Sequence, residues 1–455
     1  MLIDTIAAIS SPYGKGAVSM IRISGDESIS IVERVFKPRS GISLLDAPAG
    51  KMIYGDFYSG GEVIDDCLVA IYRAPHSYTG EDSAEIFCHG GIFLTEEILK
   101  ELFLCGARAA EPGEFSKRAF INGKLSLSQA ESVINTIDAE TRDSLLLARS
   151  HRNGVFSKEI DRIYNMLLDV ASGIYAYADY PDEDLSDMTA DEMALSLKES
   201  AEAVKKLLST YTMGKAITEG VYTVIAGKPN TGKSSVLNML LGEKRAIVSG
   251  VEGTTRDRIE ETLVLGKIKL RLVDTAGIRA SDDEIEKVGI DMSHDALSRA
   301  ELILAVFDSS SPPDEKDLLF IEEISALSAP KIAVMNKSDL QGVFECPNGF
   351  DKTVSVSAVN GYGKDSLAKA IEELFITQKI SYATDAVVVN ARQKSALERA
   401  LYFIECAINA LDSGFTPDVA CTDVESAMSS LGECDGRSVS VNIADAIFRR
   451  FCVGK

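Results

Sequence analysis

"VYTVIAGKPNTGKSSVLNML", residues 221–240, decides the fold of the middle of this chain. Its first part, Tyr222–Ala226, is an apolar run that predicts a buried strand, and a helix is predicted to open at Ser235. The turn between them has the spacing G-x-x-x-x-G-K-S, filled by Gly227, Gly232, Lys233 and Ser234. A strand, this turn and a helix in that order predict a P-loop and argue against a chance glycine-rich turn.

The chemistry of this turn is phosphate binding. Glycines let backbone N–H groups approach phosphate oxygens, and the N-terminus of the following helix adds positive potential. The Lys233 ammonium group reaches the terminal phosphates, and the Ser234 hydroxyl is a ligand for Mg²⁺. The predicted nucleotide-binding residues of the turn are Gly227, Asn230, Thr231, Gly232, Lys233, Ser234 and Ser235.

A second motif selects the base. "KIAVMNKSDL", residues 331–340, is an apolar strand that ends in Asn336, Lys337 and, two residues on, Asp339. The Asp339 carboxylate can accept hydrogen bonds from guanine, whereas adenine would leave it unpaired, so the predicted ligand is GTP. "TVSVSAVNG", residues 353–361, adds Ser357 and Ala358 for a backbone contact to the guanine oxygen.

Two loops are predicted to sense the terminal phosphate. "LRLVDTAG", residues 270–277, is a strand that ends in Asp274, which suits a water-mediated contact to Mg²⁺, and its Gly277 N–H group suits the γ-phosphate. In "SGVEGTTRD", residues 249–257, Thr255 supplies a second hydroxyl for Mg²⁺. Loops held by the γ-phosphate and released on hydrolysis form a switch. The predicted nucleotide-binding residues here are Thr254, Thr255, Asp274, Thr275, Ala276 and Gly277.

The usual catalytic glutamine is missing. Ras-like GTPases place it directly after the D-x-x-G glycine, to position the attacking water. This chain has Ile278 there, which cannot do so. The nearby "DDEIEKVG" offers Glu284 and Glu286 as replacements, and a solvated acidic loop is the alternative interpretation for both.

The sequence also leaves open which cation takes the place of an arginine finger. Losing such a finger costs a factor of ~10³–10⁵ in rate, so some cation must act in its place. Arg256 and Arg279 lie in the two loops, although loop arginines are commonly surface residues. Asn230 could instead help to hold a monovalent cation against the phosphates.

The pattern of the chain changes along its length, and 455 residues suffice for about three domains of ~150 residues. Short β-type runs with Gly-rich turns predict an α+β domain, helical spacing then takes over, and strands alternate with helices around the P-loop before helical spacing returns. Within the first part, "SGG" at 59–61 predicts a hairpin loop between strands, and "GIFLTEEILKELFLCG" at 91–106 has helical spacing. Two apolar stripes at helical spacing predict buried helix faces, one at Ile160, Ile163, Tyr164, Leu167, Leu168, Ala171 and Ile174 and one at Val424, Ala427, Met428 and Leu431. The predicted domains are 1–120, α+β; 121–218, helical; 219–378, an inserted α/β domain; and 379–455, the rest of the helical domain. The predicted class is therefore multidomain α/β.

Composition excludes several classes of protein. The formal net charge of −22 argues against a broad basic face for nucleic acid, so RNA would have to meet a local patch or a basic partner. The 8 cysteines show no C-x-x-C spacing and there are only 4 histidines, so reduced cytosolic thiols are expected, and Cys88–His89 is the only metal-like pair. No signal peptide and no membrane segment is expected.

The chain ends in "RRFCVGK", with Cys452 close to the terminus. A lipid anchor needs two aliphatic residues after the cysteine; Val453 fits and Gly454 does not. Two interpretations stay open, a reactive thiol or a tail that lines a binding site.

Several motifs together resemble a known family. "GKPNTGKSS", "GTTRD", "DTAGIR" and "NKSD" resemble the Era-like branch of translation-associated GTPases. The inserted GTPase domain, the tail "FCVGK", "PGEFSKRAFINGKLSLSQAE" and "YTGEDSAEIFCHGG" are similar to the MnmE (TrmE) family of tRNA-modification GTPases. The resemblance covers essentially the whole chain. The chain departs from the family pattern at Val453, where isoleucine is usual, and at Gln393 and Lys394, where a His-Arg pair is commoner.

For the GTPase domain, the resemblance implies a K⁺ ion bound where two such domains meet. The K⁺ ligands it implies are Asn230, Ser249, Val251 and Thr254. K⁺ would then take the place of the missing arginine. The family's water-orienting glutamate falls on Glu286, so the resemblance favours this residue over Glu284 as the catalytic group.

For the N-terminal domain, the resemblance implies a folate site that binds 5-formyl- or 5,10-methylene-tetrahydrofolate. The matching positions are Arg22, Glu85, Lys124 and Lys455. A carboxylate such as Glu85 can pair with the amino-pyrimidinone edge of a pterin, and basic groups suit the glutamyl tail. The terminus would be carried to this site, with Cys452 near the one-carbon unit as a catalytic nucleophile or as a small packed residue.

The resemblance thus implies a cytoplasmic, K⁺-dependent GTPase that is a homodimer through its N-terminal domain. With the flavoprotein MnmG, which carries FAD, it would form a heterotetramer and add an aminomethyl or carboxymethylaminomethyl group to carbon five of the wobble uridine of certain tRNAs. Two rival hypotheses are a ribosome-assembly GTPase of the same branch and a non-enzymatic folate- or RNA-binding scaffold.

Overall fold

The computed structural model describes most of the chain in two compact units. The described residues are 4–179, 188–242, 261–274, 296–344, 348–438, 441–449 and 451–454. The first unit comprises Met1–Ile134, His151–Ala201 and Arg399–Lys455, and the second comprises Asn135–Ser150 and Glu202–Glu398. The predicted fold class, α/β with separate α+β, helical and P-loop parts, is confirmed. The domain limits at 120, 218 and 378 stay predictions.

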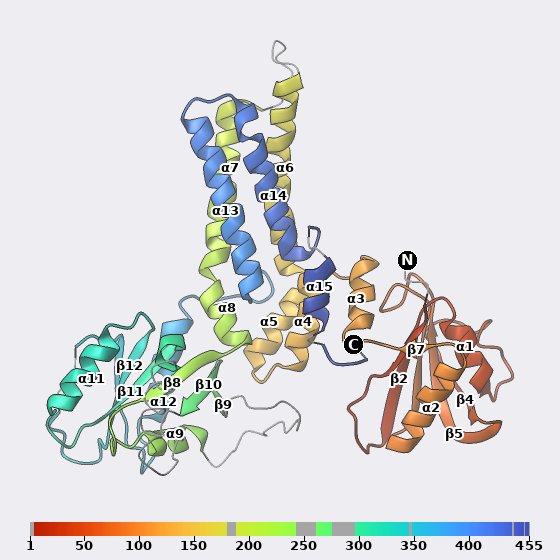
Figure 1. The fold of residues 1–455 in the computed structure, drawn as a ribbon, viewed down its shortest axis with the longest axis horizontal. Helices are drawn as coiled ribbons and strands as arrows, with labels where there is room; N and C mark the ends of the chain where they lie inside the picture. Colours follow the sequence, from red (N-terminus) through yellow and green to blue (C-terminus); the bar gives the residue numbers. More distant parts are fainter. Residues whose placement is uncertain are drawn as a thin grey trace, which may run out of the picture. The chain divides into compact units, whose positions relative to one another are not determined.

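The N-terminal part of the first unit is a sheet with helices α1 and α2 packed against it (Figure 1). The strands run in the order β3-β4-β5-β6-β2-β1-β7, and only the short β1–β7 pairing is parallel. The elements are β1 Ile6–Ile9, β2 Val18–Ser24, α1 Ser28–Val35, β3 Phe36–Pro38, β4 Met52–Ser59, β5 Glu62–Tyr72, β6 Ser83–His89, α2 Ile92–Leu104 and β7 Arg108–Ala109.

Two predictions for this sheet are confirmed. The "SGG" stretch was predicted to be a hairpin loop, and β4 and β5 are joined by Gly60 and Gly61, whose φ angles are +58° and +88°. Positive φ at both turn residues matches the right-handed twist of the paired strands, and glycine adopts it without strain. The predicted helix within "GIFLTEEILKELFLCG" is α2.

Helices make up the rest of the first unit and part of the second. They are α3 Glu114–Ile121, α4 Leu127–Ile137, α5 Arg142–Arg152, α6 Val155–Asp179, α7 Ala190–Ser209, α8 Tyr211–Thr218, α13 Ala391–Asp412, α14 Cys421–Asp435 and α15 Val441–Phe448, with a 3-10 turn at Pro417–Ala420. The α7 helix starts with a capping box. The Thr189 hydroxyl accepts a hydrogen bond from the Glu192 amide, and the Glu192 carboxylate accepts one from the Thr189 amide.

The apolar stripe predicted along α6 is confirmed, except that Tyr164 is half-buried and Leu168 is exposed. Ile160, Ile163, Leu167 and Ile174 are at most 1% exposed, whereas Leu168 is 43% exposed. Residues 167 and 168 are about 100° apart around a helix. When Leu167 lies at the centre of the buried face, Leu168 therefore lies at its edge, where it meets solvent. Residues Val424, Ala427 and Leu431 of α14, which packs on α6, are fully buried as predicted.

The second unit contains a six-stranded sheet with the order β13-β12-β11-β8-β10-β9. All pairings are parallel except that of the edge strand β9 with β10. The elements are β8 Val221–Ala226, α9 Lys233–Leu241, β9 Glu261–Leu265, β10 Ile268–Asp274, β11 Leu302–Asp308, α11 Glu315–Ser325, β12 Lys331–Asn336, β13 Lys352–Ser355 and α12 Lys364–Phe375. β8 lies between β10 and β11, so its carboxyl end is at the point where the strand order reverses. Sheets of this kind bind ligands at that point.

Among the described residues, no helix combines the length and the apolar character needed to cross a membrane.

Candidate nucleotide site and N-terminal site

The predicted P-loop connects β8 directly to α9. Gly227 passes so close to β11 that a β-carbon there would lie 2.4 Å from the Val306 carbonyl oxygen. Gly232 has a φ of +92°, and a β-carbon there would lie 2.2 Å from the side-chain nitrogen of Asn336. Both positions therefore require glycine, because a side chain would collide with groups that the sheet holds in place. Asn230 adopts left-handed backbone geometry, with a φ of +67°.

The helix begins at Lys233, two residues before the predicted Ser235. The prediction was wrong because Gly232, in its left-handed conformation, is already the N-cap residue. Within the described part of the chain no side chain caps this helix, so its first amides are presented to a ligand. Ser234 and Ser235 are exposed on the first turn. A short hydroxyl beside free amides fits a phosphate with its Mg²⁺ ion.

Lys233 and Thr231 brace the loop from inside. The Lys233 ammonium group donates to the carbonyl oxygens of Gly227 and Lys228, at 2.7 and 2.8 Å. The Thr231 hydroxyl, in a side chain that is almost fully buried, donates to the Lys228 carbonyl at 3.0 Å. The Gly227 and Lys228 carbonyls are thus occupied by ammonium and hydroxyl donors, and the backbone amides of the loop are the groups suited to a phosphate.

Asn336 joins the P-loop to the loop after β13. Its amide nitrogen donates to the Thr231 carbonyl at 2.9 Å, and its amide oxygen accepts from the Ala358 amide at 3.1 Å. The residue is 3% exposed. Losing either bond would leave a buried polar group unpaired, so Asn336 keeps the two loops at one separation.

The groups predicted to read guanine lie close together. The Ser357 hydroxyl, in a fully buried residue, donates to the Asp339 carboxylate at 2.6 Å. That bond orients the carboxylate while Asp339 itself remains exposed. Lys337 has a φ of +65°, and its ammonium group pairs with Asp308 at the end of β11. The structure therefore gathers Asn336, Lys337, Asp339, Ser357 and Ala358 at the carboxyl ends of β11, β12 and β13.

Sequence reasoning missed Asp308 and Asp317. Burial raises the pKa of Asp308, but hydrogen bonds from Lys337 and Ser310 outweigh it and hold the pKa below its ordinary value. Lys228 of the P-loop pairs with Asp317 at 2.8 Å and also with Asp314. An apolar strand that ends in an acid, as "LILAVFD" does, was the available signal for Asp308.

Several predicted residues lie outside the described residues. They are Ser249, Val251, Thr254, Thr255, Thr275, Ala276, Gly277, Glu286 and Lys455. Asp274 is the last residue of β10, which runs beside β8, so the backbone of β10 ends near the start of the P-loop.

At the N-terminal site, two predicted folate-binding residues contact each other. Arg22 of β2 and Glu85 of β6 are register partners, and Arg22 donates twice to one Glu85 oxygen, at 3.0 and 2.8 Å. The two side chains are 14% and 17% exposed. The guanidinium carbon lies 5.1 Å from the ring centre of Tyr78 and 5.7 Å from that of Phe115. A half-buried carboxylate beside aromatic rings suits a flat ring that carries amino groups.

Lys124 is exposed, and its hydrogen bond goes to neither Arg22 nor Glu85. Its ammonium group donates to the Pro75 carbonyl at 2.8 Å, in the loop that also contains Tyr78 and precedes β6. The side chain of Lys124 also covers Gly80 of this loop, where a β-carbon would lie 3.2 Å from it. The structure therefore attaches Lys124 to the loop that leads to Glu85.

The C-terminal tail is held against the N-terminal sheet. The Gly454 carbonyl accepts from the Ser10 hydroxyl at 2.9 Å, and the Cys452 carbonyl accepts from the Gly113 amide at 3.4 Å. Ser10 follows β1, two residues after Ala8, the register partner of Arg22. At ~3.3 Å per residue, the tail attaches about 7 Å along the strand from that register position. Phe451 is buried and Cys452 is exposed, so the thiol is accessible.

The metal-like pair Cys88–His89 does not form one metal site. Adjacent residues of a strand point to opposite faces. Cys88 is buried, and burial, followed by the charge of Asp65, raises the pKa of its thiol to about 11. His89 is exposed and its Nδ1 atom lies 2.7 Å from Asp65, whose hydrogen bond raises the pKa of the imidazole. Asp65, Asp66 and His89 bring one potential ligand atom each within 4.8 Å of one another.

Comparison with known proteins identifies the family of this chain. Residues 5–124 match the family model described as the GTP-binding protein TrmE N-terminus, and residues 127–452 match that of the MnmE helical domain. The chain belongs to the MnmE (TrmE) family. Among MnmE relatives, a protein named tRNA modification GTPase MnmE from Carboxydothermus hydrogenoformans is 39% identical over 463 residues, which cover 100% of both chains. Proteins of the same name from Moorella thermoacetica and Geobacillus kaustophilus are 39% and 40% identical, over 100% and 99% of both chains.

We predict that Asn336→Ala weakens GDP binding by about 10- to 100-fold, because the Thr231 carbonyl and the Ala358 amide both lose a buried partner worth ~1–3 kcal/mol. Fluorescence titration with a labelled GDP measures the affinity. Asn360→Ala is the matched control, since among the described residues the Asn360 side chain accepts from the nearby Tyr362 amide alone. Equal affinities in the wild type and the Asn336 variant would show that the bridge does not order the site.

Proposed function

We propose that this chain is a GTPase that takes part in tRNA modification. The observation that carries the proposal is the P-loop cradle, joined through Asn336 to a guanine-type motif. It lies in a chain that matches the MnmE family throughout, with relatives that are named tRNA modification GTPases and that share its full length. We propose that the chain works in the cytoplasm.

In detail, we propose that the base of GTP is held by Asp339 and its phosphates by the loop from Gly227 to Ser235. Mg²⁺ would be held by Ser234 and Thr255. The exposed Ser234 hydroxyl, at the uncapped start of α9, supports this role. K⁺, bound by Asn230, Ser249, Val251 and Thr254 where two such domains meet, would stabilise the phosphate charge. Glu286 would orient the attacking water, because Ile278 cannot do so.

We further propose that the N-terminal domain forms the homodimer and binds 5-formyl- or 5,10-methylene-tetrahydrofolate. Glu85 would take the pterin edge, with Lys124 and Lys455 near the glutamyl tail. The bonds that hold the C-terminal tail to Ser10 and Gly113, close to the register position of Arg22, support a role for the tail at this site. With the FAD-carrying partner MnmG, the chain would add an aminomethyl or carboxymethylaminomethyl group to the wobble uridine. The net charge of −22 is consistent with a partner that supplies much of the contact to tRNA.

The function is tested by mass analysis of tRNA nucleosides. A bacterial strain that lacks its own family member is complemented with this chain or with its Lys233→Ala variant. We expect the wild type to restore modified wobble uridines, and the variant, which lacks the phosphate-binding ammonium group, to leave them at the level of the deletion strain. Unmodified wobble uridines with a well-expressed wild-type chain would instead favour a ribosome-assembly GTPase.

The proposed cation and water-orienting group are tested by GTP turnover in KCl and in NaCl. We expect wild-type turnover to be at least tenfold faster in KCl. Glu286→Ala should lose at least ~100-fold in KCl, as expected when a positioned acid–base group is removed. Glu284→Ala, two residues away, is the matched control and should turn over like the wild type. Equal slow rates for wild type and Glu286→Ala in both salts would favour a non-enzymatic scaffold.

The folate site is tested by calorimetric titration of 5-formyl-tetrahydrofolate. We expect Glu85→Gln to weaken binding by about 10- to 100-fold, since a hydrogen bond to a charged group contributes ~1.5–3 kcal/mol. The control is Glu96→Gln in the same domain, where Glu96 accepts from the exposed Tyr13 hydroxyl. Thermal melts check that both variants are folded. Unchanged affinity in a folded Glu85 variant would place the pterin elsewhere.

A further inference from the structure

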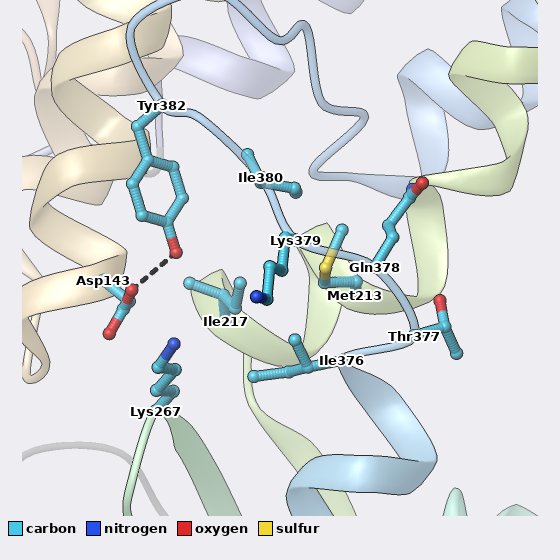
Figure 2. A pocket seen from close by; sticks show the side chains of 10 residues that line it. All are labelled: Asp143, Met213, Ile217, Lys267, Ile376, Thr377, Gln378, Lys379, Ile380 and Tyr382. Atoms are coloured by element: carbon cyan, nitrogen blue, oxygen red, sulfur yellow. Dashed lines mark hydrogen bonds between the residues drawn. The ribbon is translucent and has the colours of Figure 1, made fainter.

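A pocket of about 430 Å³ lies within the second unit, away from the P-loop residues (Figure 2). It is an open pocket lined by α8, the start of α5, the turn between β9 and β10, and the segment that follows α12. Its lining residues are Asp143, Met213, Ile217, Lys267, Ile376, Thr377, Gln378, Lys379, Ile380 and Tyr382. The volume falls in the ~300–1,000 Å³ range of small-molecule sites.

One side of the pocket is apolar. Met213 and Ile217 of α8 are each 2% exposed, and they belong to a cluster with Leu147, Val387 and Val389. Ile376 and Ile380 pack against this cluster from the segment after α12. The wall is thus supported by a packed core, and it suits the apolar body of a ligand.

The charged side chains of the lining are two lysines and one acid. Lys267 and Lys379 both line the pocket, and within the described part of the chain neither ammonium group makes an ion pair or hydrogen bond. Asp143 is the only acidic residue among those that line the pocket, and the Glu372 carboxylate accepts from the Lys267 backbone amide just outside the lining. Figure 2 shows the Lys267 ammonium group directed toward Asp143, whereas that of Lys379 lies nearer the middle of the view, beside Ile217.

One oxygen of the Asp143 carboxylate has a partner in the pocket. It accepts a hydrogen bond from the Tyr382 hydroxyl at 2.6 Å. Burial, followed by this hydrogen bond, raises the pKa of Tyr382, so the phenol remains a neutral donor at physiological pH. A hydrogen bond from a neutral phenol leaves the negative charge of Asp143 in place. The lining therefore carries two positive charges and one negative charge, and this excess favours an anionic ligand.

We propose that this pocket binds a small organic anion, with a carboxylate or phosphate group held by Lys267 and Lys379 and a ring-sized apolar body against Met213, Ile217 and Ile376. The exposed polar side chains of Thr377 and Gln378 flank the same opening. The site shares no lining residue with the nucleotide site or the N-terminal site, so it is independent of the proposed GTPase function.

The test uses the full-length chain saturated with GDP, so that the P-loop is filled. Methyl NMR signals of methionine and isoleucine report on the pocket through Met213, Ile217, Ile376 and Ile380. The anionic probes are benzoate and phenyl phosphate, and benzamide is the neutral probe of the same shape. Ligands of this size are expected to bind with dissociation constants of about 1 mM.

We expect both anions to shift the Met213 and Ile217 methyl signals to saturation, and benzamide to bind at least tenfold more weakly. A double variant, Lys267→Met with Lys379→Met, should bind the anions at least tenfold more weakly. Both lysines are exposed, so the variant is expected to fold. The control is Lys352→Met, which alters a lysine paired with Glu373 outside the pocket.

Three results would overturn the proposal: no saturable shift of the pocket methyl signals, equal binding of benzamide, or unchanged anion affinity in the double variant. If only one of the two anions binds, that result identifies the ligand's charged group as a carboxylate or a phosphate and supports the site.

Discussion

The nucleotide site depends on the side-chain amide of Asn336. One buried amide holds the Thr231 carbonyl on one side and the Ala358 amide on the other, and so sets the distance between the phosphate loop and the base loop. A glycine at position 232 is the condition for this arrangement, since a β-carbon there would lie 2.2 Å from the amide nitrogen. Asn336 and Thr231 are each 3% exposed, so the hydrogen bond between them is strong and its loss is costly.

The P-loop provides local positive groups in a protein whose net charge is strongly negative. With a net charge of −22, the chain as a whole repels an anionic nucleotide. The loop compensates with backbone amides at the uncapped start of α9 and with the Lys233 ammonium group, which already lies against the loop carbonyls. These donors are held in place before a ligand arrives, so little reorganisation is needed on binding.

The N-terminal sheet plays the same organising role for the first unit. Antiparallel pairing of β2 with β6 sets Arg22 opposite Glu85, although 63 residues separate them. The end of β1 then receives the C-terminal tail through Ser10 and Gly454, which are 444 residues apart. A sheet can gather such distant residues because its register, once set by the buried face, determines every cross-strand neighbour.

The sequence by itself determined the P-loop and its strand and helix, the β4–β5 hairpin, helix α2 and most of the buried stripe of α6. These features depend on local rules: glycine where positive φ is needed, and apolar spacing that matches 2.0 or 3.6 residues per repeat. The family was also recognisable from motifs alone. The residues of the P-loop and of the base motif lie together because each follows a parallel strand of one sheet.

Only the tertiary structure decided the rest. The bridging role of Asn336, the pairing of Lys337 with Asp308, and the Arg22–Glu85 pair are contacts between strands, and no local pattern encodes which side chains meet. The same holds for the exposure of Leu168 and for the pocket under α8, which arise from how helices and connecting segments pack. Such contacts depend on long-range register and on the volume left between elements, whereas the motifs depend only on the backbone within a few residues.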